Sequence, residues 1–221
     1  MGLIASESAK GTTAAIDTTG ATLIVVIQRQ EGSPATPMSD SEGNTWIELT
    51  KYASANFGFG VRGYYCISPT TDASHTFTNG TGAGYALAVL AFDNTGVSYD
   101  KVAGAGTAGG TSYTSIAVGA STPGQTTSLV IAGGFAFAAA GDVSALTFGA
   151  GWTQGEYFDT PSGDVDLLAS YRELTSGADL GGTLGWTTAG EGAATLIFFA
   201  ADVPAPPGGS VPIFTQQRRR R

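Results

Sequence analysis

The stretch Thr22-Leu-Ile-Val-Val-Ile27 begins a pattern that the chain repeats 106 residues later. With that offset, Leu23 corresponds to Leu129, Trp46 to Trp152 and Tyr65 to Tyr171. A three-residue insertion then pairs Phe77 with Trp186 and Asp93 with Asp202. Spacings between bulky anchors that hold over about 70 residues indicate an internal repeat. The sequence therefore predicts a duplicated unit, with halves at residues 11–93 and 113–202.

The composition indicates an all-β chain. Of the 221 residues 33 are glycine, 42% are hydrophobic and only 13% are charged, which is too apolar for a disordered chain. Apolar runs of strand length, such as residues 23–28 and 85–92, alternate with turns rich in Gly, Pro, Asn and Thr. No long stretch combines helical spacing with helix caps. We predict about ten to twelve strands and almost no helix.

The architecture follows from how few strands each half contains. A half with about five strands, folded alone, would leave one face of its apolar runs exposed. The halves could form two small sandwiches, or their strands could interlock in one sandwich, and the exposed faces favour the second arrangement. We predict a single jelly-roll-like two-sheet β-sandwich over residues 1–202, with approximate internal two-fold symmetry.

The last residues differ in composition from the rest. Residues 203–210, Val-Pro-Ala-Pro-Pro-Gly-Gly-Ser, form a spacer that is stiff and then flexible. An apolar pair and a cationic cluster follow: Ile213, Phe214, Arg218, Arg219, Arg220 and Arg221. This order predicts a docking peptide that binds an apolar pocket and acidic groups on a partner. The alternative is a solvated chain end.

The charge of the body argues against a nucleic-acid-binding domain. Without the four terminal arginines, six basic residues face 18 acidic ones, a net charge of −12. Such a surface repels phosphates. No run approaches the roughly 20 apolar residues of a membrane-spanning helix, so we also expect no membrane partner.

Catalytic and metal-binding signals are weak. His75 is the single histidine and Cys66 the single cysteine, which gives little for a zinc site or a Ser-His-Asp triad to converge on. The oxygen-rich stretches at residues 40–44 and 159–166 could hold calcium, but turn chemistry explains the first equally well. We predict no enzymatic activity, no cofactor and no metal.

Two glycan-related alternatives remain open. Trp46, Trp152, Tyr65 and Tyr171 could form a sugar-stacking platform, although their repetition favours core positions. Glu156 and Asp159 beside two aromatic residues could serve a glycosidase, but carboxylates in Gly-rich turns usually face solvent.

Several segments resemble a diffuse group of bacteriophage proteins. These are Asp17-Thr-Thr-Gly-Ala21 with the apolar run that follows, residues 40–46 (Asp-Ser-Glu-Gly-Asn-Thr-Trp), residues 64–69 (Tyr-Tyr-Cys-Ile-Ser-Pro) and residues 74–78 (Ser-His-Thr-Phe-Thr). The resemblance covers residues 11–203. The group consists of Gly/Thr/Ala-rich β-sandwich proteins of about 200 residues, encoded among structural genes of tailed phages.

The resemblance implies a non-enzymatic virion protein, such as a capsid decoration or cement protein, a head fibre or a tail-associated component. It brings no catalytic residues. Its expected location is the virion, and its expected partners are other capsid or tail proteins and, by analogy, further copies of itself. A carbohydrate-binding module that recognises host or environmental glycans is the alternative function.

Overall fold

The computed structural model describes residues 2–31, 38–56, 58–80, 86–93, 96–108, 113–138, 143, 145–159 and 165–201. All the regular secondary structure within these ranges is β. It comprises fourteen strands, of which four contain only two residues. The predicted all-β fold with almost no helix is confirmed for these residues.

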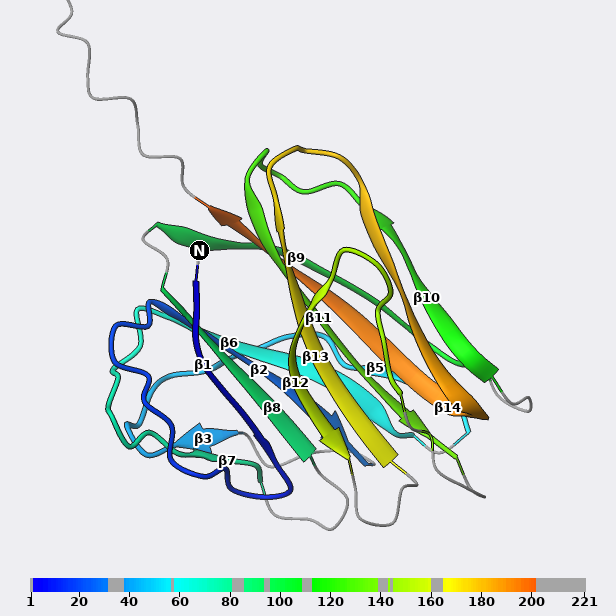
Figure 1. The fold of residues 1–221 in the computed structure, drawn as a ribbon, viewed down its shortest axis with the longest axis horizontal. Helices are drawn as coiled ribbons and strands as arrows, with labels where there is room; N and C mark the ends of the chain where they lie inside the picture. The colour runs from blue at the N-terminus through cyan, green and yellow to red at the C-terminus, as the bar shows by residue number, and fades with distance from the viewer. Residues whose placement is uncertain are drawn as a thin grey trace, which may run out of the picture.

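The strands form two large sheets that lie face to face (Figure 1). In the first sheet the order is β1 (Gly2–Ala9), β8 (Ala86–Asp93), β2 (Leu23–Gln30), β6 (Gly60–Ile67) and β4 (Ile47–Glu48), and β5 (Tyr52–Ala53) also pairs with β6. In the second sheet the order is β9 (Val97–Gly106), β14 (Leu180–Ala201), β11 (Ser128–Phe137), β13 (Val165–Leu174) and β12 (Thr153–Asp159). The predicted single β-sandwich is confirmed.

The two sheets are copies of each other in order and in register. Val25 lies opposite Tyr65 in the first sheet, and Ile131 opposite Tyr171 in the second, at the offset of 106. Likewise, β4 and β5 together occupy the place of β12. Even a β-bulge is duplicated, because the register of the edge strand shifts at Ile4 in β1 and at Asp100 in β9. The internal repeat is therefore a repeat of structure.

The prediction that the strands of the two halves interlock is wrong. Each half forms one complete sheet, and the chain passes from the first sheet to the second once, between β8 and β9. The fold keeps the two layers of a jelly roll but not its interleaved strand order. A half covers its apolar face by stacking on the other half, without exchanging strands.

Three details of the predicted repeat also change. Both halves begin earlier than predicted, because each starts with an edge strand, β1 or β9. The polar residues and glycines of these two strands interrupt the apolar pattern that identifies a strand. The last strands align with an offset of 107, since Phe92 lies opposite Leu23 and Phe199 opposite Leu129. Asp93 therefore corresponds to Ala200 and not to Asp202. A pairing based on the two aspartates alone was misleading.

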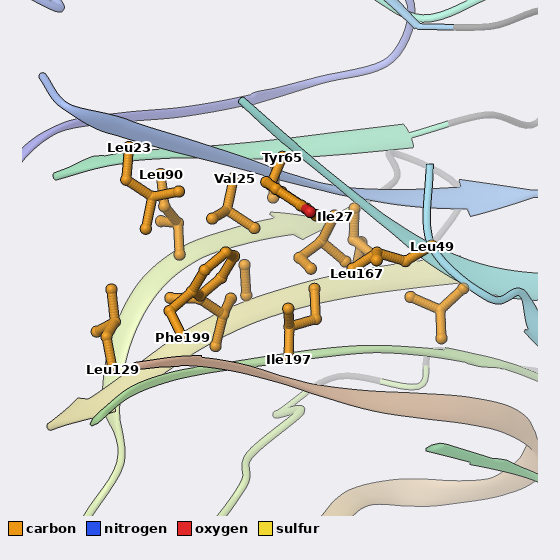
Figure 2. Close-up of a cluster of buried hydrophobic side chains, with 14 of the residues drawn as sticks. Leu23, Val25, Ile27, Leu49, Tyr65, Leu90, Leu129, Leu167, Ile197 and Phe199 are labelled. Atoms are coloured by element: carbon orange, nitrogen blue, oxygen red, sulfur yellow. The ribbon is translucent and has the colours of Figure 1, made fainter. Parts of the chain in front are cut away.

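The central core lies between the sheets and shows the approximate two-fold symmetry. Figure 2 shows Val25 and Ile27 pointing from β2 towards Phe199 and Ile197 of the other sheet. Tyr65 meets Phe199 edge-on with ring centroids 5.4 Å apart, and the equivalent pair, Phe92 and Tyr171, has the same separation of 5.4 Å. Edge-to-face pairs at this distance are favourable.

Ile27 contacts Gly133, which is the equivalent position in the second half of the repeat. Ile27 corresponds to Gly133, and a Cβ added to Gly133 would lie 2.6 Å from Cγ2 of Ile27. Two large side chains cannot share this place, so one half supplies isoleucine and the other glycine. The duplicated sheets can approach closely because this position has diverged.

Each sheet also has an outer layer. Over the first sheet, the segments around β3 (Ser39–Asp40) and β7 (Phe77–Thr78) cover a second apolar core that includes Ile24, Val26 and Tyr64. Over the second sheet, β14 extends beyond β11 and its first part pairs with β10 (Tyr113–Ser121). These strands bury Leu196 and Phe198 beneath Ile116, Leu184 and Trp186. The apolar runs of the central strands are thus covered on both faces, as their sequence predicts.

A substitution at the contact between Ile27 and Gly133 tests this packing. We expect Gly133→Val to lower the free energy of unfolding by about 1–3 kcal/mol, because its methyl groups would overlap Ile27. In the double variant Ile27→Ala/Gly133→Val the new side chain fills the vacated space, so the combined loss should be smaller than the sum of the two single losses. Urea unfolding provides the measurement.

Gly119 is the matched control, because a Cβ added there meets nothing within 4 Å. Gly119→Val should leave stability within about 0.5 kcal/mol. Strict additivity of the two core substitutions would contradict the contact between the halves.

Candidate functional site

The predicted docking residues Ile213, Phe214, Arg218, Arg219, Arg220 and Arg221 lie outside the described residues. The last described strand, β14, ends at Ala201, which pairs with Val97. Gly2 pairs with Asp93 at the same end of the sandwich. The last described strand therefore ends at the end of the sandwich where β1 begins (Figure 1).

The four repeated aromatic anchors lie in three different cores. Tyr65 and Tyr171 belong to the central core. Trp46 packs edge-on against Phe77 outside the first sheet, and Trp152 packs outside the second sheet. Because the two tryptophans are half-buried on opposite sides of the sandwich, the four rings form no common platform for a sugar. Tyr65 is a buried core residue, as predicted, and the other three anchors are half-buried residues that pack against the cores.

A polar cluster lies within the outer layer of the first half. The Thr18 hydroxyl lies 2.9 Å from Nδ1 of His75, and Nε2 of His75 lies 3.6 Å from Oδ1 of Asp40. The imidazole also stacks on the ring of Phe77, with centroids 4.2 Å apart. A hydroxyl, an imidazole and a carboxylate in this order have the composition of a catalytic triad.

Burial decides how this cluster can act. The side chains of His75 and Asp40 and the whole of Thr18 have no exposed surface. A nucleophile must reach its substrate, and here the hydroxyl is enclosed and also contacts the backbone carbonyl of Asp72 at 3.2 Å. The geometry supports a structural role, in which the cluster joins residues 17–22, 38–46 and 70–77 to one another.

Asp40 is the centre of the cluster. Its Oδ1 accepts hydrogen bonds from the backbone N–H groups of Glu42 and Asn44 at 2.8 and 3.1 Å, and its Oδ2 accepts one from Nε1 of Trp46 at 2.6 Å. This is the Asx-turn interpretation of residues 40–44, with Gly43 in the left-handed region at φ 68°. Three N–H donors occupy the oxygens that a calcium ion would need.

The positions of Thr18, Asp40 and His75 have equivalents in the second half. His75 lies opposite Ile16, as Leu184 lies opposite Ile116, and the backbone N–H of Ser41 bonds to Thr76 as that of Thr147 bonds to Gly185. These registers equate His75 with Leu184, Asp40 with Leu146 and Thr18 with Val118. The second trio is apolar and buried. The two outer layers therefore use the same three positions, once as a polar network and once as an apolar core.

A second polar group borders this layer. Gln28 donates to Asn79, and Gln30 donates to Gln28 and to the hydroxyl of Tyr64 at 3.1 Å. Burial raises the pKa of Tyr64, so its hydroxyl stays protonated. Burial and, to a lesser extent, the Asp40 carboxylate raise the pKa of the Cys66 thiol, which favours an unreactive core cysteine.

The remaining predicted candidates are dispersed. Glu156 is half-buried and Asp159 exposed on β12, and residues 160–164 of the second calcium candidate lie outside the described residues. Asp166 is buried and accepts a hydrogen bond from the hydroxyl of Tyr157. Among the residues that the structure describes, no three His, Cys, Asp or Glu side chains gather as a metal site. That part of the chain also contains no helix suited to crossing a membrane.

Two exposed isoleucines form a surface that sequence reasoning missed. Ile47 is 49% exposed and lies opposite Tyr65, and Ile67 is 37% exposed and lies two residues beyond Tyr65 on β6. Both lie on the strand face that bears Tyr65, which stacks on Tyr99 of β9. Because β4 ends after two residues, this corner of the first sheet remains open. We call Ile47 and Ile67 the isoleucine patch.

Comparison with known proteins gives no family assignment. No family model matches the chain, and neither a curated protein nor a solved structure shows significant similarity to it.

Substitutions test how much Asp40 and His75 each contribute to the stability of the fold. We expect Asp40→Asn to lower the free energy of unfolding by about 1–3 kcal/mol, because an amide nitrogen replaces an acceptor of a partly buried N–H donor. His75→Leu should change it by less than about 1.5 kcal/mol, since Leu184 fills the equivalent position and Asp40 retains three donors. Denaturant unfolding measures both variants.

Asp159→Asn on the exposed part of β12 is the matched control and should be neutral within about 0.5 kcal/mol. A loss on His75→Leu that exceeds the loss on Asp40→Asn would contradict the central place of Asp40.

Proposed function

We propose that this chain is a non-enzymatic structural component of a bacteriophage particle, such as a surface decoration, head-fibre or tail-associated protein. Residues 211–221 attach it to the particle. The observation that supports this proposal is the contrast between the two parts of the chain. An acidic, duplicated sandwich carries a short terminal segment of the opposite charge.

The construction of the body suits a domain displayed in solvent. Apolar cores fill the space between the sheets and lie on both outer faces. The sheet edges approach each other, because the hydroxyls of Ser6 and Ser8 on β1 donate to backbone carbonyls of Gly155 and Tyr157 on β12 at 3.4 Å. At the opposite pair of sheet edges, the backbone N–H of Ala55 donates to the carbonyl of Thr107 at 3.0 Å. Covered edges resist unwanted strand pairing.

The terminal segment has the chemistry of an anchor. Two large apolar residues can fill a pocket, and four arginines can form bidentate ion pairs with carboxylates on a partner. The segment follows the last described strand in the sequence, so in this proposal it docks without opening the sandwich. The body and the anchor can therefore act independently.

Deletion of residues 211–221 tests the proposal. We expect particles assembled with the truncated chain to contain almost none of it, whereas far-UV circular dichroism and urea unfolding of the purified chain should match those of the full chain. Substituting all four terminal arginines by glutamine should reduce occupancy, and less strongly at higher salt concentration, because salt already screens the ion pairs of the unsubstituted chain and the remaining apolar contact is not electrostatic. Quantitative gel analysis of purified particles measures occupancy.

The matched control changes Gln216 and Gln217 to serine, which leaves the apolar and cationic residues of the same segment intact. Full occupancy by the chain that ends at residue 210 would contradict attachment through this segment.

A further inference from the structure

The exposed apolar residues show a difference between the halves. The large hydrophobic side chains exposed among the described residues are Ile4, Ile47 and Ile67, at 40, 49 and 37%. All three lie in the first half. Their repeat equivalents by register are Asp100, Thr153 and Glu173, which are polar or charged. The second half shows that a soluble sandwich of this type can have polar residues at these positions.

Two of the three exposed isoleucines are neighbours. Ile47 and Ile67 lie on adjacent strands and form the isoleucine patch, whereas Ile4 is the bulge residue of β1 at the opposite edge of the same sheet. A pair of large apolar side chains at an open corner is a small binding surface, and Ile4 is an isolated exposed residue of the ordinary kind.

Two exposed aspartates lie at the same end of the first sheet as the patch. Backbone hydrogen bonds join Ser68, next to Ile67, to Thr22, and join Thr18 to Asp72, so residues 17–22 and 67–72 lie together at this end. Asp17 and Asp72 are exposed there. The segments 16–23, 41–48 and 66–73 contain no lysine or arginine. A ligand suited to this surface therefore presents apolar side chains followed by positive charge.

We propose that the isoleucine patch binds the C-terminal segment of a second copy of this chain. This inference rests on the proposed role of residues 211–221 as a docking peptide, and it identifies one partner of that peptide. Ile213 and Phe214 contact Ile47 and Ile67, and the arginines that follow face the acidic residues at the same end of the sandwich.

The length and composition of the spacer favour a neighbouring copy. Ile213 follows Ala201 by twelve residues, which span about 40 Å when extended. This is similar to the diameter of a 200-residue domain, roughly 35–45 Å. Proline-rich sequences favour extended conformations, and an extended segment of this length can reach a neighbouring copy. Each copy offers one segment and one patch, so the contact is head-to-tail and builds a ring or a chain of copies.

Sedimentation velocity of the full chain over a range of concentrations tests the proposal. We expect reversible self-association. The variant Ile47→Thr/Ile67→Glu, which installs the residues of the second half, should weaken the association about tenfold or more, and deletion of residues 211–221 should do the same. The control Ile4→Asp installs the residue of the second half at the third exposed isoleucine and should leave the association unchanged.

Mixing the two defective proteins provides the decisive measurement. The patch variant retains its segment, and the truncated chain retains its patch, so together they should form a 1:1 complex that does not extend further. A mixture that stays monomeric, a wild-type chain that is monomeric throughout, or an equal loss with Ile4→Asp would overturn the proposal.

Particle assays separate this inference from the proposed function. If deletion of residues 211–221 prevents incorporation while the full chain is monomeric, the segment binds another particle protein, so the proposed function stands and this inference fails. If the chain self-associates through the patch but the truncated form is still incorporated at full occupancy, attachment through the segment fails and the inference stands.

Discussion

The close approach of two sheets with the same strand order and register is the constraint on which the rest of the structure depends. Two copies stacked about an approximate two-fold axis bring equivalent residues together, and identical large side chains cannot occupy the same space. The contact between Ile27 and Gly133 resolves this conflict with one large and one absent side chain. Gly63 similarly leaves room for Ile197, and Gly155 for Leu90. Away from the axis the symmetry is kept, as the two Tyr–Phe pairs show.

Once the central core is formed, each half can change its outer layer and its surface independently. The first half replaces the apolar trio Val118, Leu146 and Leu184 with Thr18, Asp40 and His75. A polar network of this kind costs desolvation but fixes loop geometry through directional hydrogen bonds. The same half carries every large exposed apolar residue of the described chain. Duplication thus allows one copy to maintain the fold while the other acquires contacts.

Much of this fold could be predicted from the sequence, because the repeat of Leu23, Trp46 and Tyr65 reports buried positions with fixed spacing. Which strands share a sheet could not be predicted, since interlocked and stacked halves bury the same residues. Among the candidate residues, the packing of Trp46 and Trp152 against the outer cores followed from their repetition. The Thr18–Asp40–His75 cluster did not, because its members are separated by 22 and 35 positions, and only the backbone register brings them together. The isoleucine patch was missed because exposure depends on where β4 ends.

Inter-residue NOEs in solution test the central claim, the stacking of two equivalent sheets, most directly. The structure predicts NOEs between the ring protons of Tyr65 and Phe199 and, equally, between those of Phe92 and Tyr171, because both pairs bring edge and face together at 5.4 Å. It also predicts NOEs from the methyl groups of Ile27 to the α-protons of Gly133. If the Tyr65–Phe199 NOEs were present without those of Phe92 and Tyr171, or if Ile27 and Gly133 gave none, the symmetric stacking would be contradicted.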